Sequence, residues 1–284
     1  MAAVEESRCC RARLAPMLET AALRVERCCR CGTAWAEHSW ETSASPAWAG
    51  AANVTEEFLE ALRSRRAMQA VALLRRFGDA LRAGPVLDYG CGQGELTAYL
   101  LKNGIDCHGC DIDVSQVRGV PPERILRIPH PEQLPGLDGV VTLVSCDVIE
   151  HMRTPREFLA RTGDAGIRKV LLKTPLLNGP LAAAALLAAR LGRPTLLERM
   201  FQVGDPFPHH SFFTPAGLHA VAASAGYRLL GSVLVPEVGA ELPTRVRGNR
   251  ANLPRDLVLG TVGAGLALVA RLWSDTGFFL YERA

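Results

Sequence analysis

The chain has 284 residues, of which 48% are hydrophobic, a length that supports one large core with a small additional module. Its 32 basic and 29 acidic residues leave a formal charge of only +3, without the concentrated basic excess that is typical of proteins binding a phosphate backbone. The composition therefore argues against nucleic acid as a partner.

The amino-terminal region, residues 1–45, is rich in cysteine, contains tryptophan and leads into a Ser, Ala, Pro and Gly mixture over residues 38–55 that is typical of a linker. Its first 19 residues carry charges where a signal peptide needs an apolar core, so we expect a cytoplasmic protein. The chain has nine cysteines, an odd number, and several lie inside apolar segments, which argues against a disulfide framework. We expect a small module here, followed by one main domain over residues 46–284.

Cysteine spacing in this module suggests a metal site. Cys28 and Cys31, followed by Gly32, form one knuckle of the kind found in zinc ribbons. A matching pair is absent at Cys9 and Cys10, so a degenerate remnant or plain buried thiols are alternatives, and His38 could also close the site. The predicted zinc ligands are Cys9, Cys10, Cys28 and Cys31.

From residue 56 the chain alternates helix and strand patterns. Residues 56–81 repeat apolar side chains at intervals of three and four, as an amphipathic helix does. Short apolar runs separated by turns and helical patterns then predict parallel strands covered by helices on both faces. The expected strands lie within residues 85–90, 106–113, 123–129, 139–147 and 169–175, and the expected helices within 95–104 and 155–162.

The carboxyl-terminal third contains two apolar additions. Residues 178–205 are rich in Ala and Leu and predict an insertion of one or two helices, before a helix and a sixth strand within 206–235. Residues 257–273 are nearly free of charge but fall short of the roughly 20 residues that a spanning helix needs. We interpret them as a buried helix or substrate wall, with membrane-surface contact as the alternative. Residues 276–284 alternate as a final strand.

A glycine-rich turn follows the first strand of the expected sheet. Asp88, Gly90, Gly92 and Gly94 have an acid-x-Gly-x-Gly-x-Gly spacing that does not meet the dinucleotide fingerprint Gly-x-Gly-x-x-Gly. Glycines at these positions let the backbone approach a ligand closely. Asp111 lies 19 residues after Gly92, where an acid at the end of the second strand accepts hydrogen bonds from ribose. The pattern predicts a nucleoside site, and its acids disfavour a phosphate group.

These motifs resemble those of the class I S-adenosylmethionine-dependent methyltransferases over roughly residues 56–284, in particular the ubiquinone-type and natural-product branch. The resemblance implies an α/β fold with a doubly wound, seven-stranded, mostly parallel sheet whose last strand is antiparallel. It implies that the glycine loop holds the methionine part of S-adenosylmethionine, that Asp111 holds the ribose and that Ile112 packs on adenine. No residue within 127–136 is assigned to the adenine amino group. The implied cofactor-binding residues are Asp88, Gly90, Cys91, Gly92, Gly94, Asp111, Ile112, Cys146 and Asp147.

A second motif follows the fourth strand. The spacing of Asp147, Glu150 and His151 places them on one face of a turn if the segment is helical. They can cap the turn, or His151 can act as a general base, since its ordinary pKa near 6.5 suits proton transfer at neutral pH. A third interpretation is a divalent metal ion, because a similar motif binds metal in ubiquinone-type and small-RNA 2′-O-methyltransferases.

His209 and His210 precede Phe212 and Phe213 in a segment that resembles the cover of the acceptor pocket in ubiquinone-type members. Proton acceptors beside apolar walls are typical of small-molecule pockets, although an ordinary loop before a helix is the alternative. The candidate catalytic residues are His151, His209 and His210, and the sequence does not decide which of them acts.

We therefore expect a methyltransferase that transfers a methyl group from S-adenosylmethionine to a small molecule, most simply at a hydroxyl of a biosynthetic intermediate or natural product. The apolar additions favour a hydrophobic acceptor. Zinc or another divalent ion is the further cofactor that the motifs allow. The alternatives are an RNA methyltransferase with a zinc-binding module and a non-catalytic protein that binds the cofactor.

Overall fold

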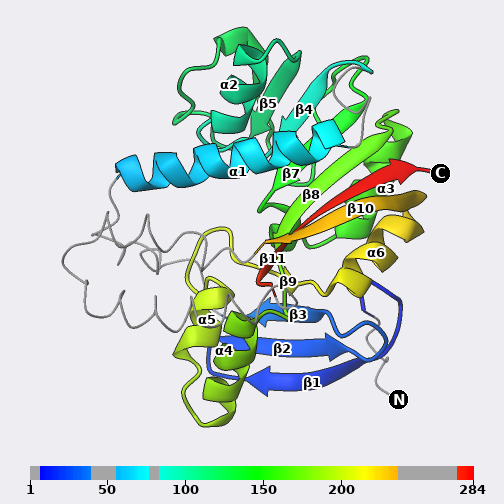
Figure 1. The fold of residues 1–284 in the computed structure, drawn as a ribbon. Coiled ribbons are helices and arrows are strands. Elements are labelled where there is room, and N and C mark those ends of the chain that lie inside the picture. Colours follow the sequence, from blue (N-terminus) through cyan, green and yellow to red (C-terminus); the bar gives the residue numbers. More distant parts are fainter. Residues whose placement is uncertain (1–6, 40–55, 77–82, 236–273) are drawn as a thin grey trace.

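The computed structural model describes residues 7–39, 56–76, 83–235 and 274–284. A seven-stranded sheet with the order β10-β11-β8-β7-β4-β5-β6 lies at its centre (Figure 1). Strand β11 pairs antiparallel with both of its neighbours, while β4 to β8 pair in parallel. The expected mostly parallel sheet with an antiparallel last strand is confirmed. The strands are β4 (Val86–Tyr89), β5 (Cys107–Asp111), β6 (Ile125–Arg127), β7 (Thr142–Cys146), β8 (Lys169–Pro175), β10 (Tyr227–Val235) and β11 (Thr276–Arg283).

Helices cover both faces of this sheet. Successive residues of a strand point to opposite faces, so neighbouring residues contact different helices. Val86 and Leu171 lie in a core cluster with helices α1 (Glu56–Arg76) and α2 (Glu95–Lys102). Their neighbours Leu87 and Leu172 lie in a second cluster with α3 (Pro155–Asp164) and α6 (Pro215–Ser224). Two short 3₁₀ helices, η3 (Pro122–Arg124) and η4 (Ile149–His151), follow β5 and β7 along the chain.

The cysteine-rich segment forms a second, antiparallel sheet with the order β1-β2-β3-β9. Its first three strands come from the amino terminus, and β9 comes from the segment before α6, so the two parts of the chain share one sheet. Trp35 of β3 also packs edge-on against Phe213, with ring centroids 5.8 Å apart, within the core cluster that contains α3 and α6. The strands are β1 (Leu14–Glu19), β2 (Leu23–Cys28), β3 (Ala34–His38) and β9 (Ser211–Phe212).

The Ala- and Leu-rich insertion forms two helices, α4 (Pro180–Arg190) and α5 (Thr195–Met200). Their buried faces pack on the amino-terminal sheet, where Ala182, Ala185 and Leu197 join Val25 and Phe212 in a third core cluster. Figure 1 shows both helices beside β2 and β3. The insertion therefore covers the second sheet.

The expected apolar segment at 257–273 lies outside the described residues, as do residues 77–81 at the end of the first predicted helix. Among the residues that the structure describes, no helix combines the length and apolar character needed to cross a membrane.

Candidate functional site

The glycine loop connects β4 to α2 at the carboxyl edge of the parallel sheet. Gly90, Gly92 and Gly94 have φ values of 73°, 55° and 88°, which L side chains rarely adopt. A Cβ atom at Gly92 would meet nothing within 4 Å, so this side of the loop is open to a ligand. The amides of Gly90 and Cys91 both donate to the carbonyl of Cys110, at 2.9 and 3.0 Å, and this ties the loop to the end of β5.

Asp88 lies beneath this loop, 3% exposed, on β4. Its Oδ2 accepts a hydrogen bond of 2.7 Å from the hydroxyl of Thr97 on α2. Burial raises the pKa of Asp88 to about 7, and the Thr97 hydrogen bond opposes that rise. The side chain thus fastens the first turn of α2 to the strand below the loop.

Replacing Thr97 by valine is expected to lower the free energy of unfolding by about 1–3 kcal/mol, because it leaves a buried carboxyl oxygen without its donor. Urea unfolding of the purified protein measures the change. Thr97→Ser keeps the hydroxyl and is the matched control. Equal stability of the valine variant and the wild type would contradict the structural role given to this bond.

Asp111 ends β5 beside the open face of the glycine loop. Its Oδ2 accepts from the Gly92 amide at 2.8 Å, and its Oδ1 accepts from the Asp113 amide at 3.2 Å. The structure therefore brings the glycine loop and Asp111 together, as the sequence motif predicted. Ile112 packs against the core cluster, half-buried, and Cys146 ends β7. The residues fit a nucleoside whose ribose lies on the Asp111 carboxylate and whose remaining part lies over Gly92.

The stretch after β6 has a structural role in the described residues. Glu132 accepts from the amides of Arg153 and Thr154, at 2.5 and 2.9 Å, before the start of α3. The Tyr89 hydroxyl donates to the carbonyl of Pro131 at 2.8 Å. The adenine amino group therefore stays without an assigned side-chain partner in this stretch.

Val148 connects the glycine loop to the second motif. A Cβ atom at Gly90 would collide with the Cγ2 methyl of Val148, so the segment after β7 lies directly against the loop. Glu150 and His151 follow within the 3₁₀ helix η4. The second motif therefore begins directly against the predicted cofactor loop.

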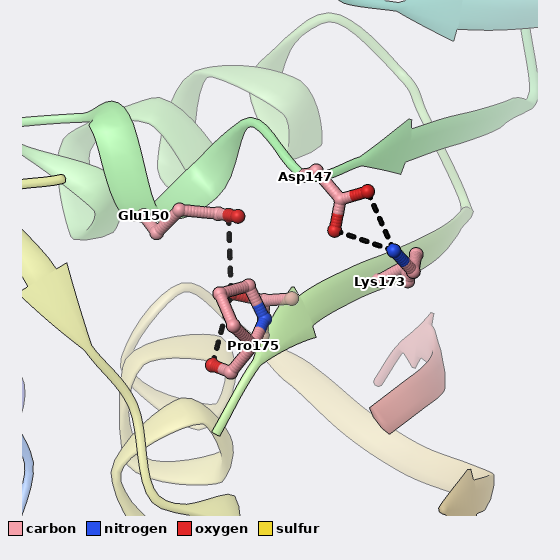
Figure 2. A network of polar contacts seen from close by, with 5 residues as sticks. Asp147, Glu150, Lys173 and Pro175 are labelled. Atoms are coloured by element: carbon pink, nitrogen blue, oxygen red, sulfur yellow. Dashed lines mark hydrogen bonds and ion pairs between the residues drawn. The ribbon is translucent and has the colours of Figure 1, made fainter. Parts of the chain in front are cut away.

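Asp147 does not share a face with Glu150 and His151, because the segment is not helical at this point. Asp147 has a φ of 58°, and Val148 has a φ of −131° and a ψ of −39°. The Asp147 carboxylate instead faces the buried Lys173 of β8, whose Nζ lies 2.7 and 2.5 Å from its two oxygens (Figure 2). The expected trio of Asp147, Glu150 and His151 is thus not assembled in the structure.

Glu150 and His151 lie instead beside His209. One donor atom from each of these side chains lies within 4.8 Å of the other two, and the rings of His151 and His209 are 4.5 Å apart. Glu150 is fully buried, and its Oε2 accepts from the Thr174 hydroxyl at 3.0 Å. Its Oε1 and the Nδ1 of His209 are buried and have no hydrogen-bond partner among the described residues. Such orphaned atoms indicate a place for a ligand.

A backbone carbonyl orients the His151 ring at this cluster. His151 Nδ1 lies 3.2 Å from the Pro208 carbonyl, so Nδ1 carries the hydrogen and Nε2 keeps its lone pair. His210 bonds through its backbone amide to the Glu150 carbonyl at 2.8 Å. Burial lowers the pKa of His151, and it lowers that of His210 to about 4, so both rings are neutral at pH 7. Burial also raises the pKa of Glu150 to about 8, with the Asp147 charge as a second cause.

His38 is a neighbour of this cluster that the sequence did not place there. It ends β3, and its Nε2 donates to the His209 carbonyl at 2.9 Å. Its ring lies 5.4 Å from that of His210. No sequence signal links residue 38 to residue 210, because the contact depends on the pairing of β3 with β9.

The four cysteines predicted as zinc ligands also meet. The sulfur atoms of Cys9, Cys10, Cys28 and Cys31 all lie within 4.8 Å of one another. His38 lies at the histidine cluster instead.

A family model described as a methyltransferase domain matches residues 60–231. No curated protein matches the sequence. A solved protein from Galdieria sulphuraria, assigned as a sarcosine dimethylglycine methyltransferase, is similar, with a TM-score of 0.53 and 12% identity over 78% of this chain and 86% of that one. Magnesium protoporphyrin IX methyltransferase from Synechocystis, solved with S-adenosylhomocysteine, has a TM-score of 0.50 and 14% identity over 80% of this chain and 86% of that one. Mycolic acid cyclopropane synthase, also solved with S-adenosylhomocysteine, has a TM-score of 0.52 and 17% identity over 85% of this chain and 90% of that one.

The matched segment spans more than half of the chain and contains the glycine loop, Asp111 and the second motif. The sheet order and the antiparallel β11 agree with the fold that the sequence motifs implied. The chain belongs to the methyltransferase domain family and is a class I S-adenosylmethionine-dependent methyltransferase.

Proposed function

We propose that the protein transfers the methyl group of S-adenosylmethionine to a hydroxyl of a small, apolar molecule. The observation that carries this proposal is the buried cluster of Glu150, His151 and His209, whose first two members follow within three residues of Val148, the residue that lies against Gly90 of the glycine loop. A hydroxyl is a weak nucleophile that reacts faster when a neighbouring group takes its proton. An amine with a free lone pair needs no such group.

In the proposed reaction the acceptor oxygen attacks the methyl carbon, and the carbon–sulfur bond breaks with its electron pair remaining on sulfur. The products are the methyl ether and S-adenosylhomocysteine. The sulfonium carbon is already activated, so alignment of oxygen, carbon and sulfur supplies much of the acceleration. His151 is the best placed proton acceptor, since its Nδ1 is engaged by the Pro208 carbonyl and its Nε2 keeps a lone pair.

The surroundings of the cluster support an apolar acceptor. Phe212 packs on His209 with ring centroids 5.2 Å apart, and Phe201 packs on Phe212 at 4.9 Å. Aromatic walls with a few convergent polar groups are typical of small-molecule sites.

The same three side chains are also a candidate site for a divalent ion. One carboxylate oxygen and two imidazole nitrogens form a donor set suited to such an ion, and the orphaned Glu150 Oε1 and His209 Nδ1 fit this role. A bound divalent ion lowers the pKa of an oxygen ligand and so favours an alkoxide or phenolate. In this form of the proposal His209 takes the place that the sequence gave to Asp147.

The experiment is a methyl-transfer assay with labelled S-adenosylmethionine and matched pairs of apolar compounds that differ only in carrying a hydroxyl or an amine. We expect label in the hydroxyl member of at least one pair, with an equal amount of S-adenosylhomocysteine. Transfer to amines alone would refute the hydroxyl assignment. Salt-dependent transfer to RNA would refute the small-molecule assignment.

A further inference from the structure

We propose that Cys9, Cys10, Cys28 and Cys31 bind one zinc ion, which fastens the amino-terminal sheet to the methyltransferase domain. Four thiolates around zinc at about 2.3 Å place their sulfur atoms about 3.8 Å apart. The four sulfur atoms here lie within 4.8 Å of one another, and those of Cys9 and Cys31 are 3.3 Å apart. The spacing therefore needs only small adjustments to close a tetrahedral site.

Two tight turns present the cysteines to one point. The first turn runs from Ser7 to Ala12, and the Ser7 amide donates a hydrogen bond of 2.8 Å to the Ala12 carbonyl. The Ser7 hydroxyl accepts from the amides of Cys10 and Ala12. The second runs from Cys28 to Gly32, where the Gly32 amide donates to the Cys28 carbonyl at 2.9 Å. Gly32 has a φ of 79°, which suits a glycine at the end of such a knuckle.

The surroundings favour a metal over other roles for these thiols. Cys9 and Cys28 are only 2% and 1% exposed, so they are poorly placed for reaction with external reagents. The 3.3 Å between Cys9 and Cys31 sulfur atoms exceeds the roughly 2.05 Å of a disulfide. Arg27 donates through Nε to the Gly32 carbonyl at 3.2 Å, which places a positive charge beside a site that would carry net negative charge.

The cysteine cluster lies where the amino-terminal sheet contacts α6. The Thr214 hydroxyl, at the N-cap of α6, donates to the Cys31 carbonyl at 2.7 Å, and its amide donates to the Thr33 hydroxyl at 3.3 Å. A Cβ atom at Gly217, in the first turn of α6, would lie 3.1 Å from the Cys31 sulfur. A zinc ion that binds both turns therefore also holds the turn from Cys28 to Gly32 against α6.

The zinc site is linked through β3 to the histidine cluster. Strand β3 begins at Ala34, three residues after Cys31, and pairs with β9, which begins at Ser211. The Ala36 amide donates to the His210 carbonyl at 2.9 Å. Loss of zinc should thus loosen β9 and the preceding histidines, while the glycine loop, which contacts none of these residues through the hydrogen bonds described, keeps its cofactor.

The test is metal analysis of the full-length purified chain, with Cys28→Ser and Cys31→Ser compared with Cys29→Ser. Cys29 lies in the same turn but is exposed and outside the cluster, so it is the matched control. We expect about one zinc per chain in the wild type and in Cys29→Ser, and a loss of about tenfold or more in the other two variants. Hydrogen exchange in peptides covering β3 and β9 should rise in the variants that lose zinc.

Because a cysteine variant can fail to fold, the wild-type chain provides a second measurement. Cobalt(II) substituted for zinc is expected to give the thiolate charge-transfer absorption and the intense d–d bands of a tetrahedral sulfur site, and Cys31→His should weaken the charge-transfer band while keeping the metal. A metal-free wild type, a cobalt spectrum without thiolate bands, or a Cys9–Cys31 disulfide in freshly isolated protein would each overturn the proposal. Methyl transfer is assayed separately, so failure of either proposal is recognised by itself.

Discussion

Replacing His151 by alanine is expected to lower turnover by about 10²–10⁴-fold while leaving the affinity for S-adenosylhomocysteine within about twofold. The reason is geometric, since His151 has its Nδ1 held by the Pro208 carbonyl and its ring against His209. It contacts no residue of the glycine loop through a described hydrogen bond. Steady-state kinetics with the acceptor found in the methyl-transfer assay, together with calorimetry of cofactor binding, measures both effects.

His219→Gln is the control for this prediction. His219 lies on α6 outside the cluster, with its Nδ1 2.7 Å from the Tyr281 hydroxyl, and glutamine retains a hydrogen-bonding group there. Its turnover should stay close to that of the wild type. If His151→Ala also keeps full turnover, proximity and alignment alone account for the reaction, and neither a base nor a metal ligand is needed at this position.

Removal of metal distinguishes a general base from a metal ligand at this cluster. If Glu150, His151 and His209 hold a divalent ion, brief treatment with a chelator should lower turnover, and added ion should restore it in the wild type but not in His209→Ala. If His151 acts only as a base, chelation should leave turnover unchanged as long as metal analysis shows that the cysteine site keeps its zinc.

Replacing Asp111 by alanine is expected to weaken S-adenosylmethionine binding by about 10- to 100-fold, because the loss of a charged hydrogen-bonding partner costs about 1.5–3 kcal/mol. Asp111 lies beside the open face of the loop, where its Oδ2 accepts from the Gly92 amide. Isothermal titration with S-adenosylmethionine and with S-adenosylhomocysteine measures the loss.

Asp113→Ala is the matched control, because Asp113 is two residues away and exposed, with its carboxylate bonded to the Ser115 amide at 3.0 Å. Its affinity should stay within about threefold of the wild type, since exposed charges contribute little. Equal affinities of the Asp111 variant and the wild type would remove the ribose-binding role from this residue. An Asp111 variant that binds the cofactor normally but turns over slowly would place its role in the reaction step instead.

The strand, glycine loop and acid of the expected cofactor site could be predicted from the sequence, because their information is local. The loop between Asp88 and Gly94 is one strand, one turn and one helix start, and the end of the next strand brings Asp111 beside it. The alternation of apolar runs also predicted each strand of the central sheet, including the last one. Parallel strands and their helices can be predicted from hydrophobic periodicity, because this pattern is contained in short windows of sequence.

The acceptor half depends on contacts that a sequence does not reveal. Asp147 has the right spacing to join Glu150 and His151, but its left-handed backbone turns the carboxylate to the buried Lys173. His209 takes that place from a segment nearly 60 residues further along the chain.

The sequence by itself determined the fold class and the strand, turn and helix of the glycine loop, since each is encoded by the type and spacing of nearby residues. It named the four cysteines as candidates, but their meeting depends on the pairing of β1 with β2. Only the tertiary structure decided that β9 completes the amino-terminal sheet, that α4 and α5 cover it, and that His38 lies beside His210. The physical reason is that strand pairing and core packing join segments far apart in the chain, where the choice of partner depends on the whole fold.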